Sequence, residues 1–101
     1  MIFGLRETDL TYISDTLRQF EEIKKAILFG SRAKGNFKKG SDIDIAIDGD
    51  NITFSTVSRL QAIFEDESPM PYKFDIVDYS HLNHDELKEH INRVGVVFYE
   101  R

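Results

Sequence analysis

The stretch ILFGSRAKGNFKKGSDIDIAID, residues 27–48, decides the expected fold of this chain. It opens with a short apolar run that ends at Gly30, a pattern typical of a strand buried on both faces. Gly30 and Ser31 then form a tight turn, because glycine lets the backbone bend sharply or approach a ligand closely. A basic loop follows, and residues 42–48 alternate between polar and apolar side chains. The stretch therefore predicts two strands joined by a turn and a loop.

The second of these strands carries a pair of carboxylates. Alternation puts Asp42 and Asp44 on one face, about 7 Å apart along the chain, and the isoleucines on the other. Such a pair repels itself unless a cation lies between, and Mg²⁺ favours one or two carboxylates together with phosphate oxygens and water. A third carboxylate from a neighbouring strand would complete a two-metal site. Asp75, in the middle of a later predicted strand, is the best candidate, and Asp78, at the end of that strand, is the weaker one.

The rest of the chain predicts an α/β (α+β) domain with a small mixed β-sheet flanked by helices. Apolar residues recur at helical spacing near residues 8–22, 53–67 and 83–94, and short strands are expected at 26–29, 42–48, 73–78 and 96–99. A further helical turn is expected at residues 31–34. With no linker, repeat or low-complexity segment, residues 1–101 are expected to form a single domain.

Composition excludes several classes of protein. The net charge of -5 argues against general nucleic-acid binding, which needs a basic footprint. Basic residues cluster only in the loop after the turn, where they suit a nucleotide better than a duplex. No apolar run has membrane-spanning length and the N-terminus does not resemble a signal peptide. The chain contains no cysteine, which excludes disulfides and thiolate metal sites and fits a cytoplasmic location.

Taken singly, these motifs are weak evidence. A D-x-D pair occurs at many exposed strand ends, and a lone Gly-Ser after a strand is equally common. The three histidines, His81, His84 and His90, surround one predicted helix and are better explained as surface or capping residues than as metal ligands. The chemical interpretation rests on the motifs occurring together, in this order and at this spacing.

That combination resembles a known signature. GSRAKGNFKKGSDIDIAI matches the pattern G-S-x(10)-D-x-D of the nucleotidyltransferase superfamily that includes DNA polymerase beta, without a departure between Gly30 and Asp44. The short chain and the GSRA start resemble the minimal nucleotidyltransferase (MNT) proteins. Asp75 falls where the family has its third acidic residue, and the order of predicted elements also fits. The resemblance implies the nucleotidyltransferase fold over most of the chain.

The resemblance also implies roles for individual residues. Gly30 and Ser31 would hold the triphosphate of ATP, and Arg32 is a further candidate for nucleotide binding, the alternative being a solvated side chain. Asp42, Asp44 and Asp75 would be the catalytic residues and would bind Mg²⁺, with two ions expected. The family transfers a nucleoside monophosphate from a nucleoside triphosphate to an acceptor hydroxyl and releases pyrophosphate.

Minimal members of the family are commonly the antitoxin of a two-gene system. Their partner is a helical HEPN (higher eukaryote and prokaryote nucleotide-binding) RNase toxin, which characterised members adenylylate on a tyrosine. The resemblance thus implies a protein adenylyltransferase that neutralises a HEPN toxin in a hetero-oligomer. Little of the chain remains for an acceptor-binding domain, so we expect that surface to come from a partner or an oligomer.

Two other functions stay open at this point. One is a catalytically weak antitoxin that inhibits its toxin by binding alone, which the small size and acidic charge permit. The other is a nucleotidyltransferase that modifies small molecules such as antibiotics, against which the lack of an acceptor domain argues.

Overall fold

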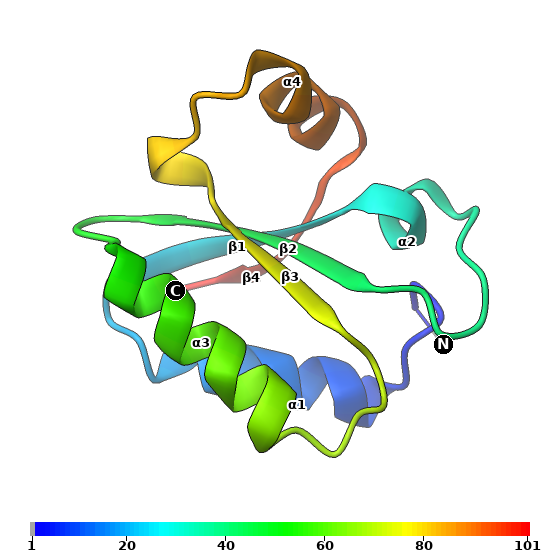
Figure 1. Cartoon of the computed structure of the whole chain (residues 1–101). Helices are drawn as coiled ribbons and strands as arrows, with labels where there is room; N and C mark the ends of the chain where they lie inside the picture. Colours follow the sequence, from blue (N-terminus) through cyan, green and yellow to red (C-terminus); the bar gives the residue numbers. More distant parts are fainter. Residues whose placement is uncertain (1) are drawn as a thin grey trace.

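Helices and strands alternate along the chain and build a four-stranded sheet with helices on both faces (Figure 1). The computed structural model describes residues 2–101. In chain order the elements are α1 (Glu7–Arg18), β1 (Ile23–Phe29), α2 (Gly30–Lys34), β2 (Ile43–Gly49), α3 (Phe54–Asp66), β3 (Phe74–Asp78), the 3₁₀ helix η1 (Tyr79–His81), α4 (Asp85–Val94) and β4 (Val96–Glu100). The predicted α/β class with a small mixed sheet is confirmed.

The sheet has the strand order β3-β2-β1-β4. β1 lies in the centre and pairs antiparallel with both β2 and β4, whereas β2 pairs parallel with β3. The parallel pair is joined through α3, since parallel neighbours need a crossover connection. This topology places the strand that follows the Gly-Ser turn directly beside the strand that carries Asp75.

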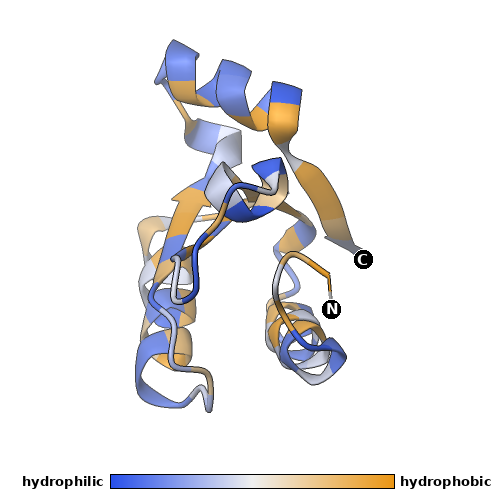
Figure 2. Cartoon of the chain, turned by 90° about the vertical axis from the view of Figure 1, so that its right-hand side faces the viewer, coloured by the Kyte–Doolittle hydropathy of each residue, from blue (hydrophilic) through white to orange (hydrophobic). Residues whose placement is uncertain are grey.

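The main hydrophobic core fills one face of the sheet, under α1 and α3. The isoleucines of β2 alternate into it as predicted, and Phe64 of α3 stacks on Phe74 of β3 with ring centroids 4.3 Å apart. In Figure 2 the strands are mostly hydrophobic, whereas the helices carry both hydrophobic and hydrophilic residues. Burial of one helix stripe against one sheet face is what holds these two layers together.

A smaller apolar cluster lies on the opposite face, where α4 packs. Ile27 and Phe29 of β1 and Ala46 of β2 meet Ile91 of α4 there. Because successive strand residues face opposite sides, Asp44 of β2 and Asp75 of β3 share this second face. The thin cover on this side keeps the acidic residues near the surface.

The N-terminal boundaries differ from the sequence prediction. The first helix was expected to run to about residue 22 and the following strand to begin at 26, but α1 ends at Arg18 and β1 begins at Ile23. Lys25 lies between Asp48 of β2 and Glu100 of β4 in the sheet register. Opposite charges across neighbouring strands favour the strand conformation at the start of β1, which the sequence prediction leaves out of the strand.

No helix within residues 2–101 combines the length and the apolarity needed to cross a membrane.

Candidate active site

The turn between β1 and α2 is pressed against the carboxylate of Asp44. Gly30 follows β1 without a linking residue and has φ +75°, a conformation that side-chain-bearing residues rarely adopt. A Cβ at Gly30 would lie 2.2 Å from Oδ2 of Asp44. Glycine is therefore needed here for its conformation and for space, and the turn and the acidic pair belong to one site.

The first turn of α2 offers free main-chain donors at the same place. Its N-cap residue, Phe29, makes no side-chain hydrogen bond to the helix, and Gly35 ends the helix in the left-handed conformation. The first N–H groups of a helix have no partners within it. Ser31 is half-buried, and its Oγ makes no hydrogen bond to any residue from 2 to 101. The polar groups of the Gly-Ser turn are thus available to a ligand.

The three predicted carboxylates come together across β2 and β3. Asp44 pairs directly with Asp75 in the parallel register, and Asp42 immediately precedes β2 on the same face. Burial raises the pKa of Asp44 to about 6, with the charges of Asp75 and Asp42 adding to the rise and the guanidinium of Arg32 opposing it. Within residues 2–101 none of the three carboxylates forms an ion pair.

This cluster fits a divalent cation by its chemistry. It gathers hard oxygen donors and negative charge, and a bound cation would offset both the burial and the like-charge repulsion that raise the pKa of Asp44. As they stand, however, no three acidic or histidine side chains of the described residues are arranged so as to hold one metal ion. Asp42 and Asp75 are exposed, so both side chains have room to turn toward an ion.

Arg32 is buried and holds main-chain groups beside the site. Its side chain is 3% exposed, so the solvated alternative is wrong. Nε and Nη2 donate to the carbonyl of Ser41 at 3.2 and 2.8 Å, and Nη1 donates to the carbonyl of Phe3 at 2.9 Å. The guanidinium also lies over the rings of Phe37 and Tyr72, 5.3 and 4.7 Å from their centroids.

These contacts make Arg32 an anchor for Ser41, the residue before Asp42, at the end of the loop that leads into β2. A phosphate contact of Arg32 stays a prediction. The sequence does not reveal the anchor, since Phe3 and Tyr72 lie far from Arg32 along the chain. The exposed Lys38 and Lys39 line a hollow of about 340 Å³ beside the same loop.

Each of the three histidines makes a contact that suits a structural role. His84 caps α4 by accepting from the N–H of Leu87 at 3.0 Å, His81 pairs with Asp78 at 2.7 Å, and His90 meets the ring of Phe29 edge to face. Phe29, the residue that His90 contacts, directly precedes Gly30 in the chain. The weaker candidate for the third carboxylate, Asp78, accepts from Ser80 and His81 and is therefore committed to the η1 turn.

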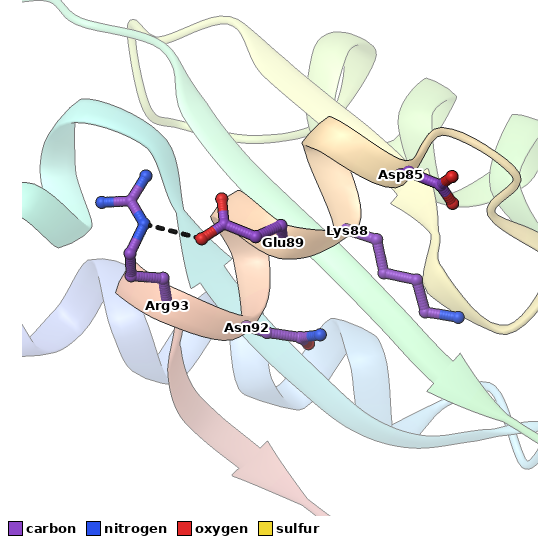
Figure 3. A pocket seen from close by; sticks show the side chains of 5 residues that line it. All are labelled: Asp85, Lys88, Glu89, Asn92 and Arg93. Atoms are coloured by element: carbon purple, nitrogen blue, oxygen red, sulfur yellow. Dashed lines mark hydrogen bonds and ion pairs between the residues drawn. The ribbon is translucent and has the colours of Figure 1, made fainter.

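A larger hollow, of about 460 Å³, lies on the outer side of α4 and contains none of the predicted site residues (Figure 3). Its walls are the polar residues Asp85, Lys88, Glu89, Asn92 and Arg93, with an ion pair of 3.0 Å between Glu89 and Arg93. Exposed i,i+4 pairs of this kind are ordinary on a solvated helix face. This hollow carries no chemistry of its own.

Comparison with known proteins agrees with the fold. The family model described as "Polymerase beta, Nucleotidyltransferase" matches residues 11–101, and the chain belongs to this nucleotidyltransferase family. Among characterised relatives, it is 33% identical over 98 residues to the probable protein adenylyltransferase MntA of Haemophilus influenzae. That alignment covers 96% of this chain and 84% of the relative.

Solved structures show the same fold. A toxin–antitoxin crystal structure with AMP-PNP matches with a TM-score of 0.70 at 24% identity, covering 96% of this chain and 75% of that one. A crystal structure of the toxin–antitoxin MntA–HepT matches with a TM-score of 0.68 at 21% identity, covering 95% and 74%. The predicted nucleotidyltransferase fold is thereby confirmed.

Proposed function

We propose that this chain is a Mg²⁺-dependent protein adenylyltransferase that transfers AMP from ATP to a hydroxyl of a HEPN toxin and so acts as its antitoxin. The observation that carries the proposal is the contact between the Gly30 turn and Asp44, with Asp75 in register beside it. The relative with 33% identity, described as a probable protein adenylyltransferase, supports AMP and a protein acceptor. Residues 1–101 act in this proposal as one catalytic domain.

Each candidate residue has a role in the proposed reaction. Gly30 and Ser31 hold the triphosphate through the donors at the start of α2. Asp42, Asp44 and Asp75 hold two Mg²⁺ ions, which when bound would acidify the acceptor hydroxyl and offset the charge of the triphosphate. Arg32 keeps the loop before Asp42 in place.

The chemical step is a substitution at the α-phosphorus. The acceptor oxygen forms a bond to that phosphorus while the bond to the oxygen that bridges to the β-phosphate breaks. Pyrophosphate leaves, and the proton of the hydroxyl passes to Asp75, the exposed carboxylate of the three that lies in mid-strand.

A second candidate function is that of an antitoxin which inhibits its toxin by binding alone. The described carboxylates are not already arranged around one ion, and the net charge of -5 suits binding to a basic surface. Growth of cells that also express the HEPN toxin proposed as the partner separates the two functions. If Asp42→Asn/Asp44→Asn fails to restore growth at the wild-type protein level, the chain is an enzyme. If the double variant restores growth as well as the wild type, inhibition is by binding.

A further inference from the structure

The outer edge of β3 is closed by a side chain rather than by another strand. β3 is the last strand on its side of the sheet and pairs only with β2. Main-chain groups alternate between the two edges of a strand. The carbonyl of Lys73 accepts from the N–H of Ile43 in β2, so the carbonyl of Phe74 and the N–H of Ile76 point outward. A strand edge of this kind ordinarily presents unpaired groups to solvent.

Gln61 of α3 satisfies both of these outward groups. Its amide nitrogen donates to the carbonyl of Phe74, and its Oε1 accepts from the N–H of Ile76 at 3.3 Å. The remaining N–H of the amide donates to Glu65 one turn further along α3, at 2.9 Å. One primary amide thus takes the place of a neighbouring strand over a single residue, and that residue is Asp75.

Asp75 depends on its main-chain contacts because no side-chain contact holds it. Its side chain is exposed and takes part in no hydrogen bond or ion pair with residues 2–101. Its position relative to Asp44 is therefore set by the main chain, through β2 on one side and Gln61 on the other. Sites for metal ions tolerate displacements of only about 0.5 Å in their ligands.

We propose that Gln61 is a positioning residue for Asp75: it fixes the β3 main chain at this point and so sets the spacing of the carboxylates of Asp75 and Asp44. The inference rests on the proposed function, since Asp75 must be a ligand for its position to matter. Gln61 does not touch the substrate or the metal, and its effect on both passes through Asp75.

Two variants on one helix face test the inference. Gln61→Met keeps the length of the side chain and its helix propensity but removes all three hydrogen bonds. Val57→Ala, one turn earlier on the same face, removes packing against the main core without touching the main chain at Asp75, and it serves as the control for lost stability. Amide hydrogen exchange is measured on the full chain, and Mn²⁺ binding is measured by electron paramagnetic resonance in the presence of a non-hydrolysable ATP analogue.

In the wild type, the N–H of Ile76 is expected to exchange more slowly than the outward N–H of Asp78, which Gln61 does not reach. Gln61→Met is expected to remove this protection and to weaken Mn²⁺ binding by about ten-fold, the usual effect of losing an outer support of a metal ligand. Val57→Ala is expected to leave both the protection of the Ile76 N–H and the affinity for Mn²⁺ unchanged. In an Asp75→Asn background, Gln61→Met is expected to cause no further loss of Mn²⁺ binding, because the ligand on which it acts is gone.

Three results would overturn the inference. One is an Ile76 amide that exchanges in the wild type as fast as that of Asp78. The second is Mn²⁺ binding that Gln61→Met leaves unchanged, and the third is an equal loss with and without Asp75→Asn. A wild type that binds no Mn²⁺ would overturn the proposed function and the inference with it, which separates the two failures.

Discussion

Gly30 begins α2 and Gly35 follows its end, and the two have positive φ angles of +75° and +86°, yet they differ in what surrounds them. A Cβ at Gly30 would meet the carboxylate of Asp44, whereas nothing lies within 4 Å of a Cβ at Gly35. At both positions a residue with a side chain would pay the cost of the left-handed conformation, about 1 kcal/mol. Only at Gly30 does the site itself depend on the missing side chain.

We predict that Gly30→Ala abolishes nucleotidyl transfer and that Gly35→Ala retains it. Both variants should lose about 1 kcal/mol of stability through backbone strain, and Gly30→Ala should lose more because Asp44 has to move. Urea denaturation and a transfer assay on the same preparations check this. Equal activities of the two variants would show that the close approach of the turn to Asp44 has no function.

Asp44 is a source of instability in the metal-free protein. Its pKa in the folded chain is about 6, against an ordinary value of 3.8, because burial and the charges of Asp75 and Asp42 disfavour the ionised form. The folded state therefore binds the proton of Asp44 more tightly than the unfolded state does. Ionised Asp44 costs stability above pH 6, and this cost disappears as the pH falls toward 4.

We predict that Asp44→Asn stabilises the chain at pH 7.5 in the presence of EDTA, by on the order of 1–3 kcal/mol. The gain should shrink toward zero near pH 4, where Asp44 is protonated in the folded state of the wild type. Denaturant unfolding of both proteins at the two pH values measures the difference in their free energies of unfolding. The contributions of the other carboxylates are the same in both proteins and cancel in this difference. A variant less stable than the wild type at pH 7.5 would contradict the origin that we assign to the shift.

At the scale of elements, the loop between α2 and β2 is held by Arg32. Its guanidinium joins the carbonyls of Phe3 and Ser41, and Ser41 also closes the loop by accepting from the N–H of Lys38 at 2.8 Å. The loop thereby delivers Asp42 to the start of β2 in a fixed position. Lys34, two residues after Arg32, is exposed and offers a matched cation without such contacts.

We predict that Arg32→Met lowers the free energy of unfolding by about 2 kcal/mol, because two partly buried carbonyls lose their charged partner. Arg32→Lys should restore only part of the lost free energy of unfolding, since an ammonium does not bridge both carbonyls as the planar guanidinium does. Lys34→Met should change stability by no more than about 0.5 kcal/mol. Thermal and urea unfolding decide the matter, and similar values for Arg32→Met and Lys34→Met would count against the anchor.

The elements that the sequence predicts well are those whose pattern is local. The alternation of residues 42–48 and the Gly-Ser turn predict β2, the start of α2 and the shared face of Asp42 and Asp44. Thr53 caps α3 where the sequence places the start of that helix. The helix expected from residue 83 begins later, at Asp85, because the imidazole of His84 accepts the capping hydrogen bond. What depends on distant partners is not visible: the burial of Arg32 needs Phe3 and Tyr72, and the support of β3 needs Gln61.

At the scale of the whole molecule, the candidate site is open and shallowly covered. α4 and the small apolar cluster cover part of the second sheet face, and the carboxylates remain at the surface. An acceptor reaches such a site only if something else orients it. This is the physical reason to expect a protein partner that brings its own hydroxyl.

We predict that the isolated chain adenylylates no small hydroxyl compound, such as an aminoglycoside, at a rate comparable with its rate on the toxin. Mass spectrometry of mixtures with ATP and Mg²⁺ checks this directly. Efficient modification of a small molecule by the chain alone would contradict the need for a partner surface and would favour the antibiotic-modifying function.

The proposed function requires Asp42 and Asp44 for the transfer of AMP to a partner protein. The most direct test is the intact mass of the HEPN toxin proposed as the partner, after incubation with ATP and Mg²⁺. The third component is the wild type, Asp42→Asn/Asp44→Asn or Asp48→Asn. Asp48 lies on the same strand face, opposite Lys25, and is the matched control. We predict the addition of AMP to the toxin by the wild type and by Asp48→Asn, and none by the double variant. AMP added by the double variant, or an inhibited toxin of unchanged mass with the wild type, would contradict the claim.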